Sequence, residues 1–233
     1  MTSVLITGCS SGYGLATARK FLDEGGWNVV ATMRTPRQDV LPSSDRLKIV
    51  ALDVTSRDSI ANAVQTAGPI DVLVNNAGIG GIGVFEATPM DTTRELFDTN
   101  TFGAMAVTQA VVPQMRSRRS GVIVNVTSST TLAAMPLAAV YTASKSAIEG
   151  FSGSLALELG FFGGAGQARR TGLRTVDGVH QQRLRPHEPN PPEDYVPFVA
   201  PIMEAFGQPG EVTTPPATSR TWCSRPPTTH RTS

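Results

Sequence analysis

A tyrosine and a lysine lie four positions apart in the stretch VYTASKSAIEG, at Tyr141 and Lys145. Residues four apart share one face of a helix, so the lysine ammonium can lie beside the phenol. A free phenol has a pKa of about 10, and lowering it to about 7 takes roughly 4 kcal/mol of differential stabilisation. An ammonium about 4 Å away supplies ~4 kcal/mol at an effective dielectric constant of about 20. Such a pair can exchange protons near neutral pH, whereas the alternative is an ordinary pair on a helix surface.

A glycine-rich stretch near the start of the chain is typical of a dinucleotide site. The residues TGCSSGYG follow the apolar run SVLIT and precede LATARKFLDEGG, which has helical spacing. Glycines at these positions permit a tight turn, close approach of the backbone to a pyrophosphate, and close packing of helix and strand. The alternative is a glycine-rich connection without a ligand. The predicted cofactor-binding residues of this stretch are Thr7, Gly8, Ser10, Ser11, Gly12, Tyr13 and Gly14.

The residue after the second predicted strand indicates which dinucleotide is bound. An acidic residue there often binds the ribose 2′-hydroxyl of NAD. Here the strand NVVATM, residues 28–33, is followed by Arg34. A guanidinium can instead hold the 2′-phosphate of NADP by charge-assisted hydrogen bonds, each worth roughly 1.5–3 kcal/mol. We therefore predict NADP, with NAD and a solvated surface arginine as the alternatives.

The remaining elements must bring these two groups of residues together. Nearly continuous apolar runs at 3–7, 28–33, 47–54, 70–78 and 121–129 alternate with helical patterns at 15–26, 55–68, 91–119 and 138–162. Such alternation predicts an α/β fold with a doubly wound, mostly parallel, Rossmann-like sheet. Ligands of such sheets bind at the carboxyl ends of the strands. Thr7, Asn75 and Ser128 stand at such ends, although serines there also serve as helix caps or turn residues.

The chain changes character after Phe162. Residues 1–162 form the predicted dinucleotide-binding and catalytic domain, whereas residues 163–233 form an atypical C-terminal segment. Eleven of the 17 prolines lie from Pro186 onward, and the stretch after Phe162 has no sustained apolar period. We expect this segment to be irregular.

Composition excludes several classes of protein. Hydrophobic residues make up 40% of the chain, charged residues 17%, and the formal net charge is +1, so neither a nucleic-acid nor a membrane partner is expected. The two cysteines, Cys9 and Cys223, lie far apart and have no metal-ligand spacing, so we expect no disulfide framework. We expect no metal, and a cytoplasmic location.

Four motifs, in order and at the right spacing, resemble those of the short-chain dehydrogenases/reductases. They are TGCSSGYG at 7–14, NNAG at 75–78, Ser128, and Tyr141 with Lys145. The resemblance covers about residues 1–162. It implies hydride transfer between NADP(H) and an alcohol, ketone or steroid-like substrate.

The resemblance also implies a role for each matching residue. Tyr141 would be the general acid/base, Lys145 would lower its pKa and hold the nicotinamide ribose, and Ser128 would orient the substrate oxygen. Asn100 would hold a water in the proton relay, although a satisfied helix residue is an equal alternative. The implied cofactor contacts beyond the glycine-rich stretch are Asp53, Val54, Asn75, Ala77 and Gly78.

The chain departs from the family after the long helix. GGAGQARRTGLRTVDG stands where members continue into a sixth strand ending in Pro-Gly, so we expect the sheet to lose the strand beside the fifth. One hypothesis is that residues 163–190 and 216–233 are out-of-frame translation of a dehydrogenase gene. The alternatives to an enzyme are thus a non-catalytic, redox-sensing dinucleotide-binding protein and an inactive product of a frame-shifted gene. By family analogy, the apolar end of the long helix predicts a homodimer or homotetramer.

Overall fold

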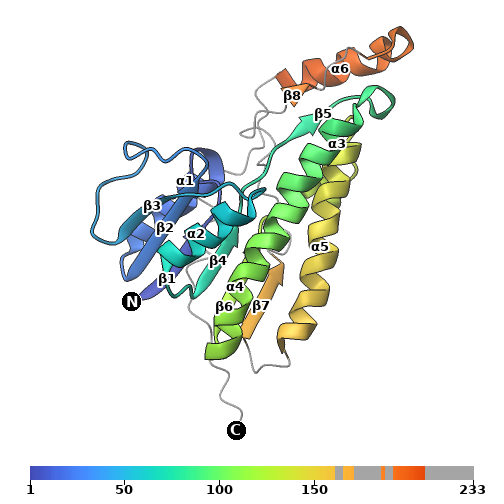
Figure 1. Cartoon of the computed structure of the whole chain (residues 1–233). Helices are drawn as coiled ribbons and strands as arrows, with labels where there is room; N and C mark the ends of the chain where they lie inside the picture. The colour runs from blue at the N-terminus through green and yellow to red at the C-terminus, as the bar shows by residue number, and fades with distance from the viewer. Residues whose placement is uncertain (161–164, 171–184, 187–190, 208–233) are drawn as a thin grey trace.

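The computed structural model of the chain describes residues 1–160, 165–170, 185–186 and 191–207 (Figure 1). The strands are β1 (Thr2–Ile6), β2 (Trp27–Met33), β3 (Leu47–Ala51), β4 (Val72–Asn75), β5 (Gly81–Ile82), β6 (Gly121–Asn125), β7 (Ala165–Arg170) and β8 (Arg185–Pro186). The α-helices are α1 (Gly12–Glu24), α2 (Arg57–Ala67), α3 (Met90–Phe97), α4 (Ala104–Arg118), α5 (Ala139–Gly160) and α6 (Val196–Gly207). Shorter turns of helix are η1 (Phe85–Ala87), the π-helical η2 (Asp98–Gly103), η3 (Ser129–Thr131) and η4 (Glu193–Tyr195).

The central sheet confirms the predicted doubly wound fold. Its six strands run parallel in the order β3-β2-β1-β4-β6-β7, with β5 and β8 forming a separate pair. The order reverses between β1 and β4, and ligands of open α/β sheets bind beside such a reversal, outside the carboxyl ends of the strands. The long helix predicted over 91–119 also forms, but as α3 and α4 joined through η2.

The prediction that the sheet ends at the strand 121–129 was wrong. β7 pairs in parallel with β6, from Gly121 opposite Ala165 to Asn125 opposite Arg170, with an irregularity between Gly121 and Val122. A parallel ladder is made by backbone groups, and an edge strand is bonded on one side only, so a polar sequence can supply it. The first part of the proposed out-of-frame segment therefore joins the sheet, whereas 171–184 and 216–233 lie outside the described residues.

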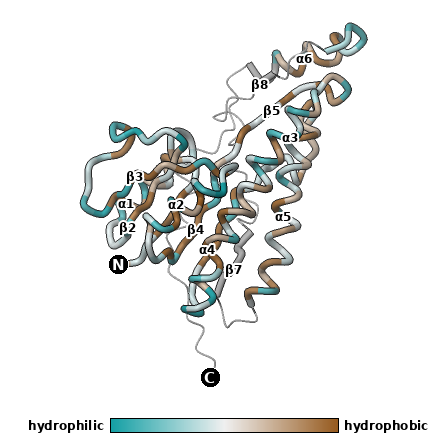
Figure 2. Tube along the Cα trace, in the orientation of Figure 1, coloured by the Kyte–Doolittle hydropathy of each residue, from teal (hydrophilic) through white to brown (hydrophobic). Residues whose placement is uncertain are grey.

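The core has two layers, one on each face of the sheet, because successive strand residues point to opposite faces. Figure 2 shows hydrophobic residues along the strands. Leu5, Leu73 and Ile123 pack with Val107 and Val111 of α4 on one face of the sheet. On the other face, the strand residues Val4, Ile6, Val29 and Val74 pack with Ala18, Phe21 and Leu22 of α1. Because both faces are covered, the strands read as continuous apolar runs.

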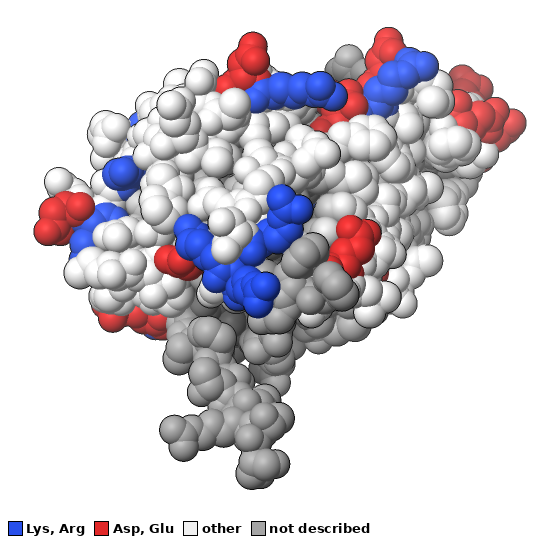
Figure 3. All heavy atoms as spheres, turned by 60° about the horizontal axis from the view of Figure 1, so that its bottom comes forward, with Lys and Arg blue, Asp and Glu red and all other residues white. Residues whose placement is uncertain are grey.

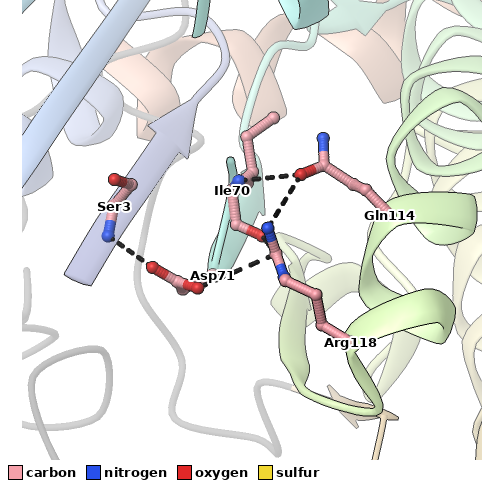
Figure 4. A network of polar contacts seen from close by, with 5 residues as sticks. All are labelled: Ser3, Ile70, Asp71, Gln114 and Arg118. Carbon is pink, nitrogen blue, oxygen red and sulfur yellow. Dashed lines mark hydrogen bonds and ion pairs between the residues drawn. The ribbon is translucent and has the colours of Figure 1, made fainter. Parts of the chain in front are cut away.

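A polar network fastens the amino end of the sheet (Figure 4). The Asp71 carboxylate accepts a hydrogen bond from the Ser3 backbone N–H at 2.8 Å and lies 3.7 Å from the Arg118 guanidinium. Gln114 accepts from the Ile70 N–H at 2.9 Å, and Arg118 donates to the Ile70 carbonyl. Figure 3, which brings this end forward, shows Lys and Arg side chains gathered near the middle of the face.

Candidate active site at the carboxyl end of the sheet

Two glycines fix the turn between β1 and α1. Gly8 has φ 74°, a conformation that favours glycine, and a Cβ there would lie 2.8 Å from the Ala77 Cα. A Cβ on Gly14 would lie 2.3 Å from the Gly8 carbonyl oxygen. Helix α1 therefore packs against its own turn at a distance that only glycine permits.

Asn76 holds this turn, a role that the sequence analysis missed. Its amide Nδ2 donates to the Thr7 and Gly8 carbonyls at 2.9 and 3.2 Å. The Thr7 hydroxyl in turn accepts from the backbone N–H groups of Asn76 and Ala77, at 3.0 and 2.9 Å. These hydrogen bonds join the ends of β1 and β4, and the Thr7 hydroxyl is one of the groups that make them. The doubled asparagine in NNAG was the available signal.

The neighbouring Asn75 does not face the turn. Its buried Nδ2 donates to the Thr108 hydroxyl of α4 and to Asn125 Oδ1 of β6, each at 2.8 Å. Asn125 donates onward to the Ser152 hydroxyl of α5 at 2.7 Å. This side chain therefore joins the sheet to the helices behind it, and the expected contact of Asn75 with the cofactor stays a prediction.

The N-termini of α1 and α2 differ in a way that fits phosphate binding. The Ser56 side chain caps α2 by accepting from the Ser59 N–H at 3.3 Å, and Asp58 lies in the first turn. Helix α1 has neither a side-chain cap from Ser11 nor an acidic residue in its first turn. Its positive end is thus not neutralised by its own side chains, as a pyrophosphate site requires.

The basic and acidic residues beside this turn come from the ends of β2 and β3. Arg37 donates to the Ser10 carbonyl at 2.8 Å, so the segment after β2 lies against the glycine-rich turn. The carboxylate of Asp53 accepts from the Thr55 hydroxyl and N–H at 2.7 and 2.9 Å. These hydrogen bonds, with a smaller contribution from the Arg34 charge, lower the pKa of Asp53. Arg34 is exposed after β2.

Other predicted cofactor contacts lie after the ends of β3 and β4 and at the start of α1. Val54 is buried, and a Cβ on Gly103 would lie 2.7 Å from its Cγ2, so it packs against η2. Ala77 and Gly78 follow β4 in the loop that contacts the glycine-rich turn. Gly12 and Tyr13 begin α1.

Tyr141 and Lys145 lie on the first turns of α5, both buried, with 4% and 3% of their surfaces exposed. Burial raises the pKa of Tyr141, and a hydrogen bond with the Ser128 side chain partly offsets that rise. Burial also lowers the pKa of Lys145 to about 8, and its Nζ donates to the Val126 carbonyl at 3.0 Å. The expected lowering of the Tyr141 pKa was wrong, because desolvation of the phenolate dominates.

Asn100 lies in η2, where the helix is widened to a π-turn. Its side-chain oxygen accepts from the Ile79 N–H at 2.8 Å, and its Nδ2 donates to the Ile79 carbonyl at 2.9 Å and to the Ser144 hydroxyl at 3.1 Å. Ser144 donates to the Tyr141 carbonyl at 2.7 Å. Asn100 therefore ties the loop after β4 to the start of α5, and its role with a relay water stays a prediction.

A groove of about 950 Å³ lies over α2, η2, α4 and α5, and Val54 is the one predicted cofactor contact that lines it. Phe102, which is 56% exposed, lines it together with Met105 and Phe151. The homodimer or homotetramer expected from the sequence involves the same helix, α5, and stays a prediction. No helix within the described ranges is both long and apolar enough to span a membrane. The same ranges hold no group of three His, Cys, Asp or Glu side chains arranged for a metal ion.

The sequence profile of the family described as short chain dehydrogenase matches residues 2–163. The uncharacterised oxidoreductase YusZ of Bacillus subtilis (strain 168) is 41% identical over 170 residues, which are 68% of this chain and 60% of that protein. Retinol dehydrogenase 8 of Homo sapiens is 41% identical over 167 residues, which are 67% of this chain and 54% of that protein. The chain thus spans 54–60% of the length of these curated relatives.

Solved structures of short-chain dehydrogenases have the same fold. A short-chain dehydrogenase from Streptomyces avermitilis superposes with a TM-score of 0.75 at 33% identity, covering 94% of this chain and 81% of that one. ElxO with NADP bound gives a TM-score of 0.65 at 29% identity, covering 70% and 69%. A 3-ketoacyl-(acyl-carrier-protein) reductase from Brucella melitensis complexed with NADH gives 0.64 at 28% identity, covering 69% and 70%.

Proposed function

Because the chain belongs to the short-chain dehydrogenase/reductase family, we propose that it transfers a hydride between NADP(H) and an alcohol or carbonyl substrate. One observation supports this proposal above the others. A buried phenol, Tyr141, is hydrogen-bonded to Ser128 and shares a helix face with the buried Lys145. Ser128 and the Val126 carbonyl that Lys145 contacts follow the carboxyl end of β6, and the glycine-rich turn follows the carboxyl end of β1, so the three residues and the turn share one end of the parallel sheet.

The cofactor would lie along the crevice between the ends of β1 and β4. The uncapped N-terminus of α1 would hold the pyrophosphate of the cofactor, and Asp53 would contact the adenine end. Arg34 would hold the 2′-phosphate, with Arg37 beside it, and these two cations are the reason to prefer NADP over NAD. When bound, the nicotinamide supplies or accepts the hydride.

The protein's own residues would handle the proton. A raised pKa keeps the Tyr141 phenol protonated at neutral pH, which is the form that donates to a carbonyl oxygen. As the carbonyl carbon gains a hydride, its oxygen takes this proton and becomes a hydroxyl. Ser128 would fix the position of that oxygen, and the Lys145 ammonium would stabilise the phenolate left behind.

The substrate would be apolar. The loop residue Leu132 and the helical residues Phe85, Val196 and Phe198 expose half or more of their surfaces, and their segments lie toward the same end of the molecule (Figure 1). A hydrogen bond of 2.9 Å between the Tyr195 hydroxyl and Glu86 connects η4, just before α6, to η1. The curated names retinol dehydrogenase 8 and 17-beta-hydroxysteroid dehydrogenase type 1 among the relatives favour the same class of substrate.

A substrate panel tests the proposal. Purified protein is titrated with NADPH and NADH by fluorescence and then assayed for NADPH oxidation with ketones of increasing apolar size. We expect NADPH to bind more tightly than NADH and a bulky apolar ketone to be reduced. NADPH binding without turnover of any ketone or alcohol would instead support a redox-sensing protein.

A further inference from the structure

A third polar residue continues the stripe that carries Tyr141 and Lys145. Glu149 lies four positions beyond Lys145 on α5, so the three side chains leave the helix on one face. Glu149 is half-buried, although it stands beyond the residues that the family motif contains. All three side chains reach the same segment, which leads from β6 into η3.

The contact of Glu149 within this segment is Thr131. Its carboxylate Oε1 lies 2.7 Å from the Thr131 hydroxyl oxygen. That hydroxyl oxygen also lies 2.7 Å from the Ser128 carbonyl oxygen, and the Thr131 N–H donates to the same carbonyl at 3.2 Å. The hydroxyl has one proton to donate and stands between two acceptors. Thr131 therefore links the carboxylate of α5 to the backbone of Ser128.

The Ser128 hydroxyl is held from the other side of the same turn. It accepts from the Thr130 N–H at 3.3 Å and from the Thr130 hydroxyl at 3.1 Å, which makes Ser128 the N-cap of η3. Before Ser128 in the chain, the Val126 carbonyl is fixed by Lys145 at 3.0 Å. Both ends of the segment 126–131 are thus anchored to α5, by Lys145 at one end and by Glu149 at the other.

We propose that Glu149, acting through Thr131, is a positioning residue that holds the Ser128 hydroxyl at hydrogen-bond distance from the Tyr141 phenol. This inference rests on the proposed function, because the purpose of the position is to orient a substrate oxygen between Ser128 and Tyr141. Misplacing a reacting group by about 1 Å can lower a rate about 100-fold. Loss of the Glu149–Thr131 contact is therefore expected to lower kcat by about 10- to 100-fold and to leave NADPH affinity unchanged.

Paired substitutions separate positioning from packing. Glu149→Ala removes the carboxylate, and Thr131→Val removes the hydroxyl while keeping the shape. Glu149→Gln and Thr131→Ser keep a partner for the same hydrogen bond. We expect kcat to fall in the first pair and to stay within about threefold of the wild-type value in the second. Glu95→Ala, at an exposed glutamate of α3, is the control and should change nothing.

A double-mutant cycle identifies the residue through which Glu149 acts. If it acts on Ser128, Glu149→Ala should have no further effect on kcat once Ser128 is alanine. Multiplying effects in the double variant would contradict the proposal, because the two residues would then act independently.

Hydrogen exchange tests the same contact without turnover. In Glu149→Ala and in Thr131→Val, the backbone amide at position 131 should exchange faster than in the wild type, while Glu149→Gln and Glu95→Ala keep the wild-type rate. Unchanged exchange, or a wild-type kcat in both disruptive variants, would overturn the inference. A wild-type protein that reduces no substrate would count against the proposed function instead, and the exchange rates would still decide whether Glu149 holds the Ser128 turn.

Discussion

The two ends of the parallel sheet are both rich in hydrogen bonds, yet they differ in how their charges are matched. At the amino end, Arg118 faces Asp71, and both side chains are about one-third exposed (Figure 4). At the carboxyl end, Lys145 is buried, and no carboxylate of the described residues lies within ion-pair distance of it. Buried, unmatched charges are costly and gather at functional sites, whereas exposed pairs contribute little. Both ends are polar, so polarity does not distinguish them. The structural network at the amino end pairs its charges, whereas the candidate active site at the carboxyl end contains a buried charge without an ion-pair partner among the described residues.

The largest difference between the two ends should appear in turnover. Ser128→Ala removes the side chain that bonds Tyr141, and we expect kcat to fall about 100- to 1000-fold, the usual cost of losing one donor to a developing oxyanion. Steady-state kinetics with NADPH and an apolar ketone measures this change. A fall of less than threefold would place Ser128 among the structural cap residues.

The glycine-rich turn should be the next most sensitive feature. Gly14→Ala places a Cβ 2.3 Å from a backbone oxygen, and we expect the free energy of unfolding to fall by about 1–3 kcal/mol, with weaker NADPH binding. Gly150→Ala on α5 is the matched control, since nothing lies within 4 Å of a Cβ there. It should raise stability by about 0.5–1 kcal/mol. Thermal unfolding of both variants checks the opposite signs.

The arginine after β2 should decide between the two dinucleotides. Arg34→Ala should raise KM for NADPH by about 10- to 100-fold, the equivalent of one charge-assisted hydrogen bond of ~1.5–3 kcal/mol, and leave KM for NADH unchanged. Arg94→Ala, at an exposed arginine of α3, is the control. Equal effects on both cofactors would remove the NADP assignment.

The burial of Lys145 should make the free energy of unfolding depend on pH. Its pKa is lowered from 10.5 to about 8, so between these values the unfolded chain holds a proton that the folded chain has lost. Stability relative to Lys145→Met should therefore rise as pH increases from about 8 to 10, by up to about 3 kcal/mol. Denaturant unfolding at several pH values measures this slope, and a flat difference would show that the lysine is not desolvated.

The smallest effects are expected at the amino end. Arg118→Ala should lower the free energy of unfolding by about 1 kcal/mol, because an exposed pair contributes little and its hydrogen bond to the Ile70 carbonyl can be replaced by water. kcat should not change. A loss of turnover comparable with that of Ser128→Ala would erase the contrast between the two ends.

The sequence located the glycine-rich turn, the strand ends and the helix of Tyr141 and Lys145 because the signals for these features are local. The glycines, the strand ends and the spacing of Tyr141 and Lys145 can be read without knowing the rest of the chain. Which of two adjacent asparagines faces the turn could not be read this way, because successive side chains of a strand point to opposite faces. Asn75 enters the helix layer, and Asn76 holds the turn.

The structure differs from the sequence-based expectation at two further points, β7 and the pKa of Tyr141, and the sequence motifs report the physical cause of neither. β7 forms from a polar sequence because strand pairing uses backbone groups, so the absence of an apolar pattern did not exclude it. The pKa of Tyr141 is raised because it is buried, and burial depends on tertiary packing that the spacing of Tyr141 and Lys145 does not report.

Substitution of Tyr141 by phenylalanine tests the central claim most directly. NADPH affinity and the rate of ketone reduction are measured on the same preparation, with far-UV circular dichroism to confirm folding. The phenol is assigned to proton transfer and not to cofactor binding, so affinity should stay within about twofold while reduction falls by about 100- to 10,000-fold. Reduction at the wild-type rate by a folded Tyr141→Phe protein would contradict the account.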